Sequence, residues 1–263
     1  MAARVGMVLS GGGVRGVAHI GVIKALEEEG IRPEIVSGSS AGAVVGALYC
    51  NGFTPEEMMN FFKVIPLFHI NRFAFRKPGF IDTDKFHEDF KKYFPKDNFN
   101  TLQKKLFITT VDMLNGRVKI FDKGELIRPF LASAAFPGIF SPVTIDNGVY
   151  ADGGILDNFP VEPLKDICDQ IIGVYISPIA KITPEKLKHS LNVLDRAIKI
   201  NFSNGSRLKF SECDLVIHPP SLSKYGLFDK NGIDEIFDIG YQTTLDKLRG
   251  YKNLVALTGK DEN

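Results

Sequence analysis

The stretch "VSGSSAGAVVGAL", residues 36–48, places a glycine, two serines and a second glycine between a short β-branched run and a helix of small residues. Its core, residues 38–42, fits the G-x-S-x-G motif, in which a serine stands on a sharp strand-to-helix turn of an α/β sheet. The start of the following helix would place free N–H groups and the positive end of the helix dipole beside Ser40. We therefore predict that Ser40 is a nucleophile; the alternative is that the glycines only permit a tight turn.

Strand-like and helix-like segments alternate along the rest of the chain. Buried strands are expected at residues 4–10, 33–39, 170–177 and 213–219, and hairpins at Asn115-Gly116 and Asn147-Gly148. Helices are expected at residues 17–30, 41–52, 54–64, 82–94, 125–136, 191–210 and 233–251. The alternation predicts an α/β fold, a three-layer α/β/α sandwich with a mainly parallel central sheet, built as one domain over residues 1–263.

The composition narrows the class of protein. The chain has 263 residues, a hydrophobic fraction of 44% and a net charge of +1, which leaves no excess of Lys and Arg to bind nucleic acid. The three cysteines are isolated, a pattern typical of reduced thiols rather than of a disulfide framework. No signal peptide or membrane-spanning segment is recognisable. We therefore expect a cytoplasmic protein that contacts membranes, if at all, at their surface. The oligomeric state stays open, a homodimer included.

A second motif, "LSGGGVRGVAH" at residues 9–19, places three glycines between a strand and a helix. The exposed amides of such a loop form a nest that binds a phosphate or the oxyanion of a tetrahedral intermediate. The dinucleotide fingerprint fails because Glu34 lies at the wrong end of the second strand, and the P-loop fails because Val17-Ala18 replace Lys and Ser/Thr. An oxyanion hole fits better; a helix-capping turn with a solvated Arg15 is the alternative.

The serine also needs a proton acceptor. Among five histidines, only His218, at the end of a strand, lies where a late catalytic histidine is tolerable. In "YADGGILDNFP", residues 150–160, Asp152 follows a strand and precedes two glycines. Burial there would raise the pKa of its carboxyl and let it take the serine proton directly. A turn aspartate in a hairpin has the same pattern, and the spacing alone does not separate the two interpretations.

Three blocks in this order, "GGGVRG", "GSSAG" and "ADGG", resemble the signature of the patatin-like phospholipases. The similarity extends to "HIGVIKALEE" and "SAAFPGIFSPV" and covers about residues 4–178. The resemblance implies hydrolysis of lipid acyl esters without a metal or cofactor, by a Ser–Asp dyad with Ser40 as nucleophile and Asp152 as base. It also implies an oxyanion site formed by one loop: Gly11, Gly12 and Gly13, with Arg15 and Gly16.

Residues 58–80 are rich in Phe and Ile and carry four basic residues with almost no acid. Such a segment suits a lid or a surface that meets lipid head groups, and it fits a helix packed on the core or a dimer contact as well. Two classes stay open besides a phospholipase A, lysophospholipase or esterase. One is a non-catalytic regulatory or binding protein on the same fold; the other is a nucleotide-binding oxidoreductase, disfavoured by the missing ribose acid.

Overall fold

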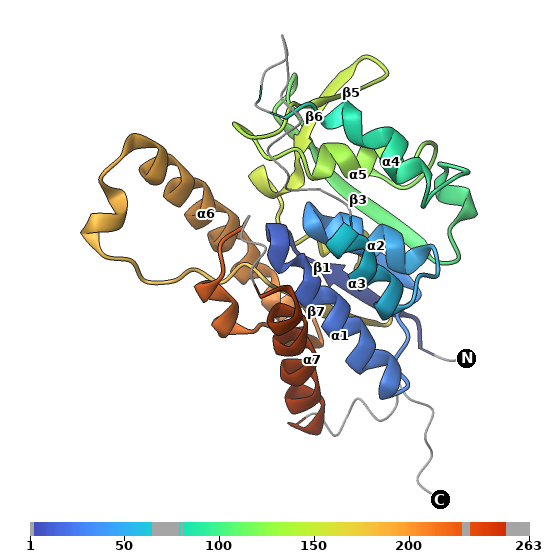
Figure 1. The fold of residues 1–263 in the computed structure, drawn as a ribbon. Coiled ribbons are helices and arrows are strands. Elements are labelled where there is room, and N and C mark those ends of the chain that lie inside the picture. The colour runs from blue at the N-terminus through green and yellow to red at the C-terminus, as the bar shows by residue number, and fades with distance from the viewer. Residues whose placement is uncertain (1–2, 65–78, 80, 228–231, 251–263) are drawn as a thin grey trace, which may run out of the picture.

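The computed structural model describes residues 3–64, 79, 81–227 and 232–250. Its strands are β1 Val5–Leu9, β2 Ile35–Ser39, β3 Lys105–Asp112, β4 Arg117–Phe121, β5 Val143–Ile145, β6 Gly148–Asp152, β7 Gln170–Val174 and β8 Leu215–Ile217. They form one sheet in the order β5-β6-β3-β2-β1-β7-β8, with β4 paired to β3 off this path (Figure 1). The run from β3 to β8 is parallel, and β4, β5 and β6 add antiparallel pairs. The predicted α/β class with a mainly parallel sheet is confirmed.

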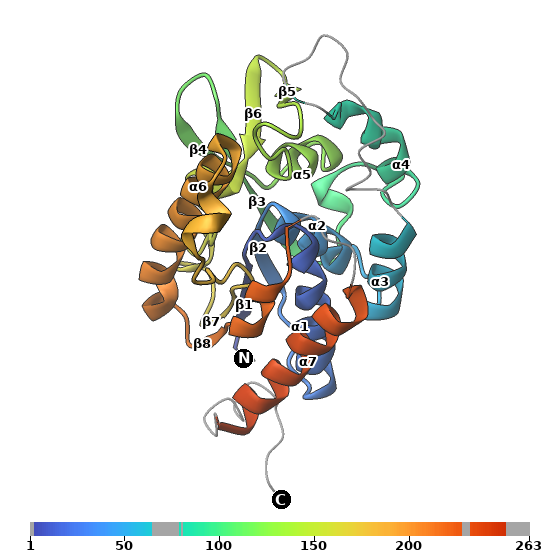
Figure 2. The same ribbon diagram turned by 60° about the vertical axis from the view of Figure 1, so that its left-hand side comes forward.

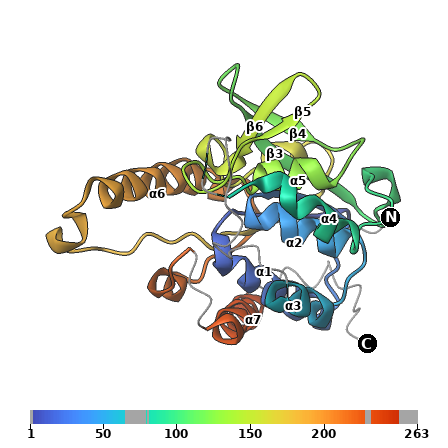
Figure 3. The ribbon, with the colours of Figure 1, turned by 45° about the horizontal axis from the view of Figure 1, so that its top comes forward.

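The helices are α1 Val17–Glu28, α2 Ala41–Cys50, α3 Pro55–Val64, α4 His87–Lys91, α5 Ile127–Ser133, α6 Ser190–Leu208 and α7 Ile233–Gly250. One of the helices expected from the sequence is divided in the structure. The single helix predicted at 82–94 is a 3₁₀ turn followed by the short α4, because the Asp82 side chain accepts from the Asp84 N–H and begins a tight turn. Helix α6 projects from the body of the molecule at one edge (Figures 1 and 3).

The two faces of the sheet are covered differently. Successive side chains of a strand point to opposite faces. Met7 and Leu9 of β1 belong to the large core shared with α1, α2, α3 and α5. Val8 belongs to a smaller core, in which it packs with Phe159 and Leu164 of the connection between β6 and β7. The third layer of the sandwich therefore consists of this connection, with its 3₁₀ turns, and of α6, which lies on the side of the sheet away from α1 and α7 (Figure 2).

The hairpin turns lie close to the predicted dipeptides. Residues 113–116 join β3 to β4, and Gly116 adopts a positive φ of 65° there. Between β5 and β6 the turn residues are Asp146 and Asn147, so Gly148 already belongs to β6 and the predicted turn is one residue late. All three cysteines are free thiols. No helix in the described ranges has the length and apolarity needed to cross a bilayer.

Helix α7 lies directly against α1 (Figure 2). A Cβ atom added at Gly21 of α1 would come within 2.1 Å of the Phe237 carbonyl oxygen, and one added at Gly240 of α7 within 2.1 Å of the Ala18 carbonyl oxygen. No real contact is that short, so each helix needs glycine where it crosses the other. Helix α7 thus packs on α1, which follows the glycine-rich motif, through direct backbone contacts.

We expect Gly240→Ala to destabilise the protein, because the added methyl group forces α7 away from α1. Overpacking of this kind costs about 1–3 kcal/mol, and the melting temperature should fall by roughly 2–4 °C for each kcal/mol. Gly205→Ala in α6 is the matched control, since its added methyl meets nothing within 4 Å; there the melting temperature should stay level or rise, because alanine favours helix. Equal melting temperatures for the two variants would refute the close packing.

Candidate active site

Two strands of opposite direction end against each other on one edge of β3. Ser39, the last residue of β2, pairs with Thr109, and Asp152, the last residue of β6, pairs with Thr110. Strand β4 occupies the other edge of β3. Because β2 runs parallel to β3 and β6 runs antiparallel to it, their carboxyl ends meet. The residue that follows β2, Ser40, is therefore placed beside Asp152.

Ser40 stands between β2 and α2 in an unusual backbone conformation. Its φ is 52° and its ψ is −123°, a region that non-glycine residues seldom adopt and that is held only where the surroundings impose it. The Ser40 N–H donates to Ser133 Oγ at 2.8 Å, and the Ser133 hydroxyl donates to the Thr109 carbonyl oxygen at 2.6 Å. The Ser40 hydroxyl donates to Asp152 Oδ2 at 2.8 Å. The turn thus aims the hydroxyl at the carboxylate.

The two motif glycines are required by close packing. A Cβ atom at Gly42 would lie 2.1 Å from the Leu9 carbonyl oxygen, and one at Gly38 would lie 2.6 Å from the Gly42 carbonyl oxygen. The turn after β2 therefore presses its backbone on the end of β1. The sequence left two interpretations of the glycines, a tight turn or the placement of the serine. In the structure the same tight turn also directs the Ser40 hydroxyl to Asp152.

Asp152 is almost completely enclosed, with 1% of its surface exposed. Loss of hydration disfavours its charged form and raises the pKa of the carboxyl to about 7, although hydrogen bonds from the Ser40 hydroxyl and the Gly154 N–H favour the charged form. A carboxyl group with a pKa near 7 is well matched to accepting a proton at neutral pH. The burial foreseen for this residue is confirmed by the structure.

Two residues of the glycine loop line the cavity and have backbone N–H groups without an acceptor in the described residues. The Gly11 N–H donates to the Asn158 carbonyl oxygen at 3.2 Å and is therefore already occupied. Within the described residues, the N–H groups of Gly12 and Gly13 have no acceptor, and both residues line the cavity that contains Ser40. The same holds for Ala41, the first residue of α2. Three amides without an acceptor therefore belong to residues that line the cavity containing the serine.

The other two loop residues singled out from the sequence have supporting positions. Arg15 is 7% exposed, and its guanidinium donates to the Tyr225 carbonyl oxygen from Nε at 3.0 Å and from Nη2 at 2.6 Å. It ties the loop to the segment before α7. Gly16 lies against Ala41, whose Cβ would be 2.8 Å from an added Cβ. Gly16 is not among the residues that line the cavity.

One cavity of about 410 Å³ contains these groups. Ser40, Asp152, Gly12 and Gly13 lie at its wall. Much of the remaining lining is apolar and comes from the helical side of the sheet: Val44, Phe62, Phe86, Leu131, Phe136 and Phe140. A further wall is formed by the residues that follow β7 and by α6. A hydroxyl, a buried carboxylate and free amides thus share an apolar cavity, which suits attack on an ester of an apolar acid.

The family model for patatin-like phospholipases matches residues 7–165 of the chain. The chain belongs to this family. Lysophospholipase nte1 of Emericella nidulans is 28% identical over 290 residues, covering 98% of this chain and 19% of the relative. Lysophospholipase nte1 of Neurospora crassa is 27% identical, covering 93% of this chain and 18% of the relative. The chain spans about a fifth of the length of these relatives.

The fold is also similar to that of VipD from Legionella pneumophila. The TM-score is 0.56 with 15% sequence identity, and the match covers 94% of this chain and 67% of that one. At this identity the similarity concerns the fold alone. The similarity to VipD agrees with the mixed sheet and the flanking helices described above.

Sequence reasoning missed Asn158. It is 4% exposed, lines the cavity, and neither polar atom of its carboxamide has a hydrogen-bond partner. A Cβ at Gly11 would lie 2.4 Å from Asn158 Oδ1 and 3.0 Å from Ser40 Cβ, which places the carboxamide close to the serine. The signal was present in "DGGILDNFP", where an asparagine precedes Phe-Pro in a glycine-rich turn, but only its aspartate was singled out.

None of the four described histidines lines the cavity, so the histidine alternative for the base is wrong within this part of the chain. The ring of His218 packs on Tyr175 and Phe210, on the sheet face opposite the large helical core. His19 is fully buried, and burial lowers its pKa to about 4 while its Nε2 lies 2.8 Å from the Ser10 carbonyl oxygen. His69 lies outside the described residues.

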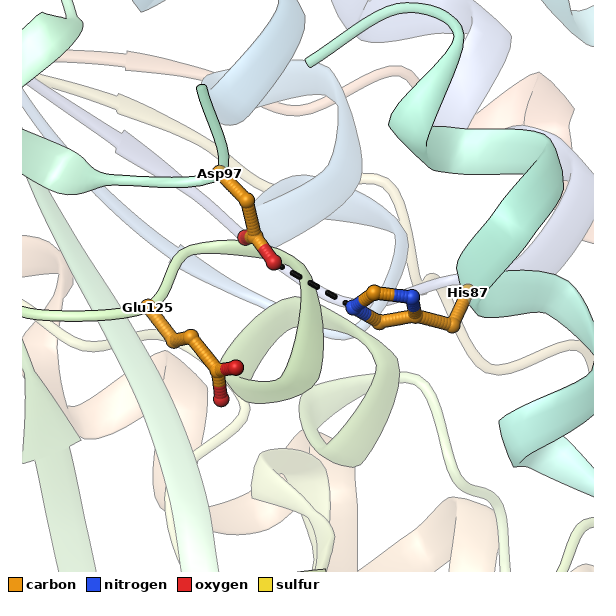
Figure 4. A group of neighbouring side chains, drawn as sticks. All are labelled: His87, Asp97 and Glu125. Carbon is orange, nitrogen blue, oxygen red and sulfur yellow. Dashed lines mark hydrogen bonds and ion pairs between the residues drawn. The ribbon is translucent and has the colours of Figure 1, made fainter. Parts of the chain in front are cut away.

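A cluster of His87, Asp97 and Glu125 has the chemistry of a metal site (Figure 4). Their ligand atoms lie within 4.8 Å of one another. Asp97 is already engaged, however, since Oδ1 accepts from the N–H groups of Leu126 and Ile127 and Oδ2 lies 3.2 Å from His87 Nε2. The cluster is therefore accounted for as a cap at the start of α5, and none of its three residues lines the cavity.

Most of the predicted lipid-facing segment, residues 58–80, lies outside the residues that the structure describes. Residues 65–78 and 80 are not among the described residues. Residues 58–64 form the end of α3, where Met58, Phe61 and Phe62 are buried and Phe62 lines the cavity. Contact of this segment with a membrane stays a prediction.

The burial of Asp152 should make stability depend on pH. Its pKa is higher in the folded protein, at about 7, than the ordinary 3.8, so the folded state holds its proton more tightly. The contribution of this carboxyl group to stability is then greatest below pH ~4 and declines as the pH rises to ~7. Asp152→Asn removes this penalty, so its melting temperature should exceed that of the wild type by a margin that grows between pH 4 and pH 8. The exposed Asp146→Asn is the control, and parallel curves for all three proteins would contradict the argument.

Proposed function

We propose that this chain is a serine acyl hydrolase that cleaves fatty-acyl esters of lipids through Ser40 and Asp152. The observation that carries the proposal is the 2.8 Å hydrogen bond from the Ser40 hydroxyl to a carboxylate with almost no exposed surface. The membership in the patatin-like phospholipase family supports lipid hydrolysis in general. The relatives named lysophospholipase favour esters with a single acyl chain.

The first half of the reaction transfers the acyl group to the serine. Asp152 takes the proton of the Ser40 hydroxyl as Oγ attacks the ester carbonyl carbon, and the carbonyl oxygen becomes an oxyanion. When the tetrahedral intermediate collapses, the bond to the alcohol oxygen breaks and Asp152 returns the proton to that oxygen. The products are an acyl-serine ester and the alcohol part of the lipid.

The second half regenerates the serine. Asp152, again unprotonated, takes a proton from a water molecule that attacks the acyl-serine carbonyl. Collapse of the second intermediate releases the fatty acid, and the proton passes back to Ser40 Oγ. Both halves need the carboxylate unprotonated at the start and protonated midway, and the pKa of about 7 favours such exchange near neutral pH.

The oxyanion is stabilised by preorganised donors. Gly12, Gly13 and Ala41 line the cavity that contains Ser40, and their N–H groups have no acceptor within the described residues. Ala41 begins α2, whose dipole places positive charge there. This set replaces part of the one expected from the sequence, because the Gly11 amide is occupied by Asn158. One such donor contributes about 10²–10³ in rate in comparable hydrolases. The Asn158 carboxamide, whose two polar atoms have no hydrogen-bond partner, adds a further donor through Nδ2.

Ser40→Ala should abolish hydrolysis of a lysophospholipid and labelling by a fluorophosphonate probe, because among the described hydroxyls that line the cavity only that of Ser40 donates to Asp152. Asp152→Asn should lower kcat by several orders of magnitude. Ser39→Ala is the matched control, since the neighbouring hydroxyl is buried, lacks a partner and is absent from the cavity lining. It should keep most of the activity. Undiminished turnover by Ser40→Ala would refute the role of Ser40 as nucleophile. A wild type that neither turns over lipid nor takes the probe would favour the non-catalytic alternative.

Asn158→Ala should lower kcat by about 10²-fold, the effect expected for loss of one oxyanion donor, and should change KM little. The fold contact made by this residue uses its backbone carbonyl and survives the substitution. The melting temperature and the rate of fluorophosphonate labelling are measured alongside. A normal kcat would show that the carboxamide does not face the reacting oxygen.

A further inference from the structure

The cavity is positively charged on one side. Its charged lining residues are one acid, Asp152, and five bases: Arg15, Lys186, Arg196, Lys199 and Lys224. Arg15 is engaged with the Tyr225 carbonyl oxygen, and Lys224 lies over the Tyr225 ring. The remaining three come from α6 and from the 3₁₀ turn that precedes it, residues 184–187.

Two basic residues and one aromatic residue of α6 lie on the same face of the helix and line the cavity. Arg196, Lys199 and Phe202 follow one another at three-residue spacing, which keeps them on one face of a helix. All three line the cavity. The rise of a helix places Lys199 about 4.5 Å and Arg196 about 9 Å from Phe202 along the axis.

The end of α6 that carries Phe202 lies beside residues 154–155, which follow Asp152. The Phe202 ring lies 6.1 Å from the Phe136 ring, edge to face, and the Asn201 side chain donates to the Ile155 carbonyl oxygen at 3.0 Å. A Cβ at Gly154, whose N–H binds Asp152, would lie 2.9 Å from Phe202. The two bases therefore continue outward from the reacting groups along α6, which projects from the body (Figure 1).

The opposite side of the cavity is apolar. Val44, Phe62 and Leu131 come from α2, α3 and α5, and none of the acidic side chains in the described residues lines that side. A ligand that spans the cavity with its ester at Ser40 would meet apolar surface with one end and positive charge with the other. These are the requirements of an acyl chain and an anionic group.

We propose that Arg196 and Lys199 of α6, with Lys186, bind the anionic head group of the lipid ester and make the site prefer lipids with net negative charge. The inference rests on the proposed hydrolase function and names its substrate class. A guanidinium binds a phosphate through paired hydrogen bonds, and the two lysines add point charges. A zwitterionic head group brings a quaternary ammonium toward the same bases, and this repulsion sets the discrimination.

The test compares two lysophospholipids with the same acyl chain, lysophosphatidylglycerol and lysophosphatidylcholine, both as monomers in solution so that a lipid surface plays no part. For the wild type, kcat/KM should be at least tenfold higher with the anionic lipid. The Arg196→Gln/Lys199→Gln variant should lose at least tenfold with the anionic lipid and less than threefold with the zwitterionic one. Arg207→Gln is the matched control, since this arginine is exposed on α6 and does not line the cavity.

A second measurement separates this inference from the hydrolase proposal. Calorimetric titration of the Ser40→Ala protein with each lysolipid measures head-group binding without turnover. The Ser40→Ala/Arg196→Gln/Lys199→Gln variant should bind the anionic lipid at least tenfold more weakly than Ser40→Ala does. Competition by inorganic phosphate alone, without discrimination between the two lipids, would assign the bases to a free anion instead. Equal losses on both lipids, or none, would overturn the head-group site even if Ser40 proves catalytic. Selective binding without any hydrolysis would overturn the catalytic role and leave the head-group site standing.

Discussion

Strand β3 pairs with β2 along residues 105–109 and with β6 along residues 110–112, and the change of partner brings two strand ends together. Ser40 and Asp152 are 112 residues apart in the chain, yet their side chains lie 2.8 Å apart because each directly follows or ends one of these strands. The glycine loop after β1 joins them, since β1 is the other neighbour of β2. The hydroxyl, the carboxylate and the free amides are therefore held by the sheet itself rather than by mobile connections.

The burial that raises the pKa of Asp152 also lowers the stability of the folded protein at neutral pH. A carboxyl group without water resists ionisation, so its pKa rises into the range where it exchanges a proton with a serine or with water. The folded protein must then hold an unfavourable charge at neutral pH or keep the proton. The positive φ of Ser40 adds local strain of a kind that is often found at functional sites. Close backbone packing, as at Gly42 against Leu9, is what holds this arrangement in place.

The proposed catalytic groups and the proposed head-group site belong to different parts of the chain. The family model covers residues 7–165, which contain Ser40, Asp152 and the glycine loop. Helix α6 lies beyond that range, and it supplies the basic wall of the same cavity. The proposed reaction and the proposed substrate preference can thus be separated along the chain, because the cavity is lined by both segments.

Much of the fold and part of the site could be predicted from the sequence, because the signals are local. The alternation of strand and helix patterns indicated the α/β class, and the G-x-S-x-G motif indicated the turn at Ser40, since glycine is required where backbones touch. The role of Asp152 could not be separated from that of a turn residue, because its neighbour is set by strand pairing between distant segments. The same reason explains why Gly11 was counted as a free donor and why Asn158 was overlooked. The helix expected at 82–94 was too long for a local reason, the tight turn that the Asp82 side chain begins. The sequence alone determined which segments form strands and helices and which residues carry reactive groups. Only the tertiary structure decided which of those groups meet, because register along β3 and burial in the cavity are properties of the assembled sheet.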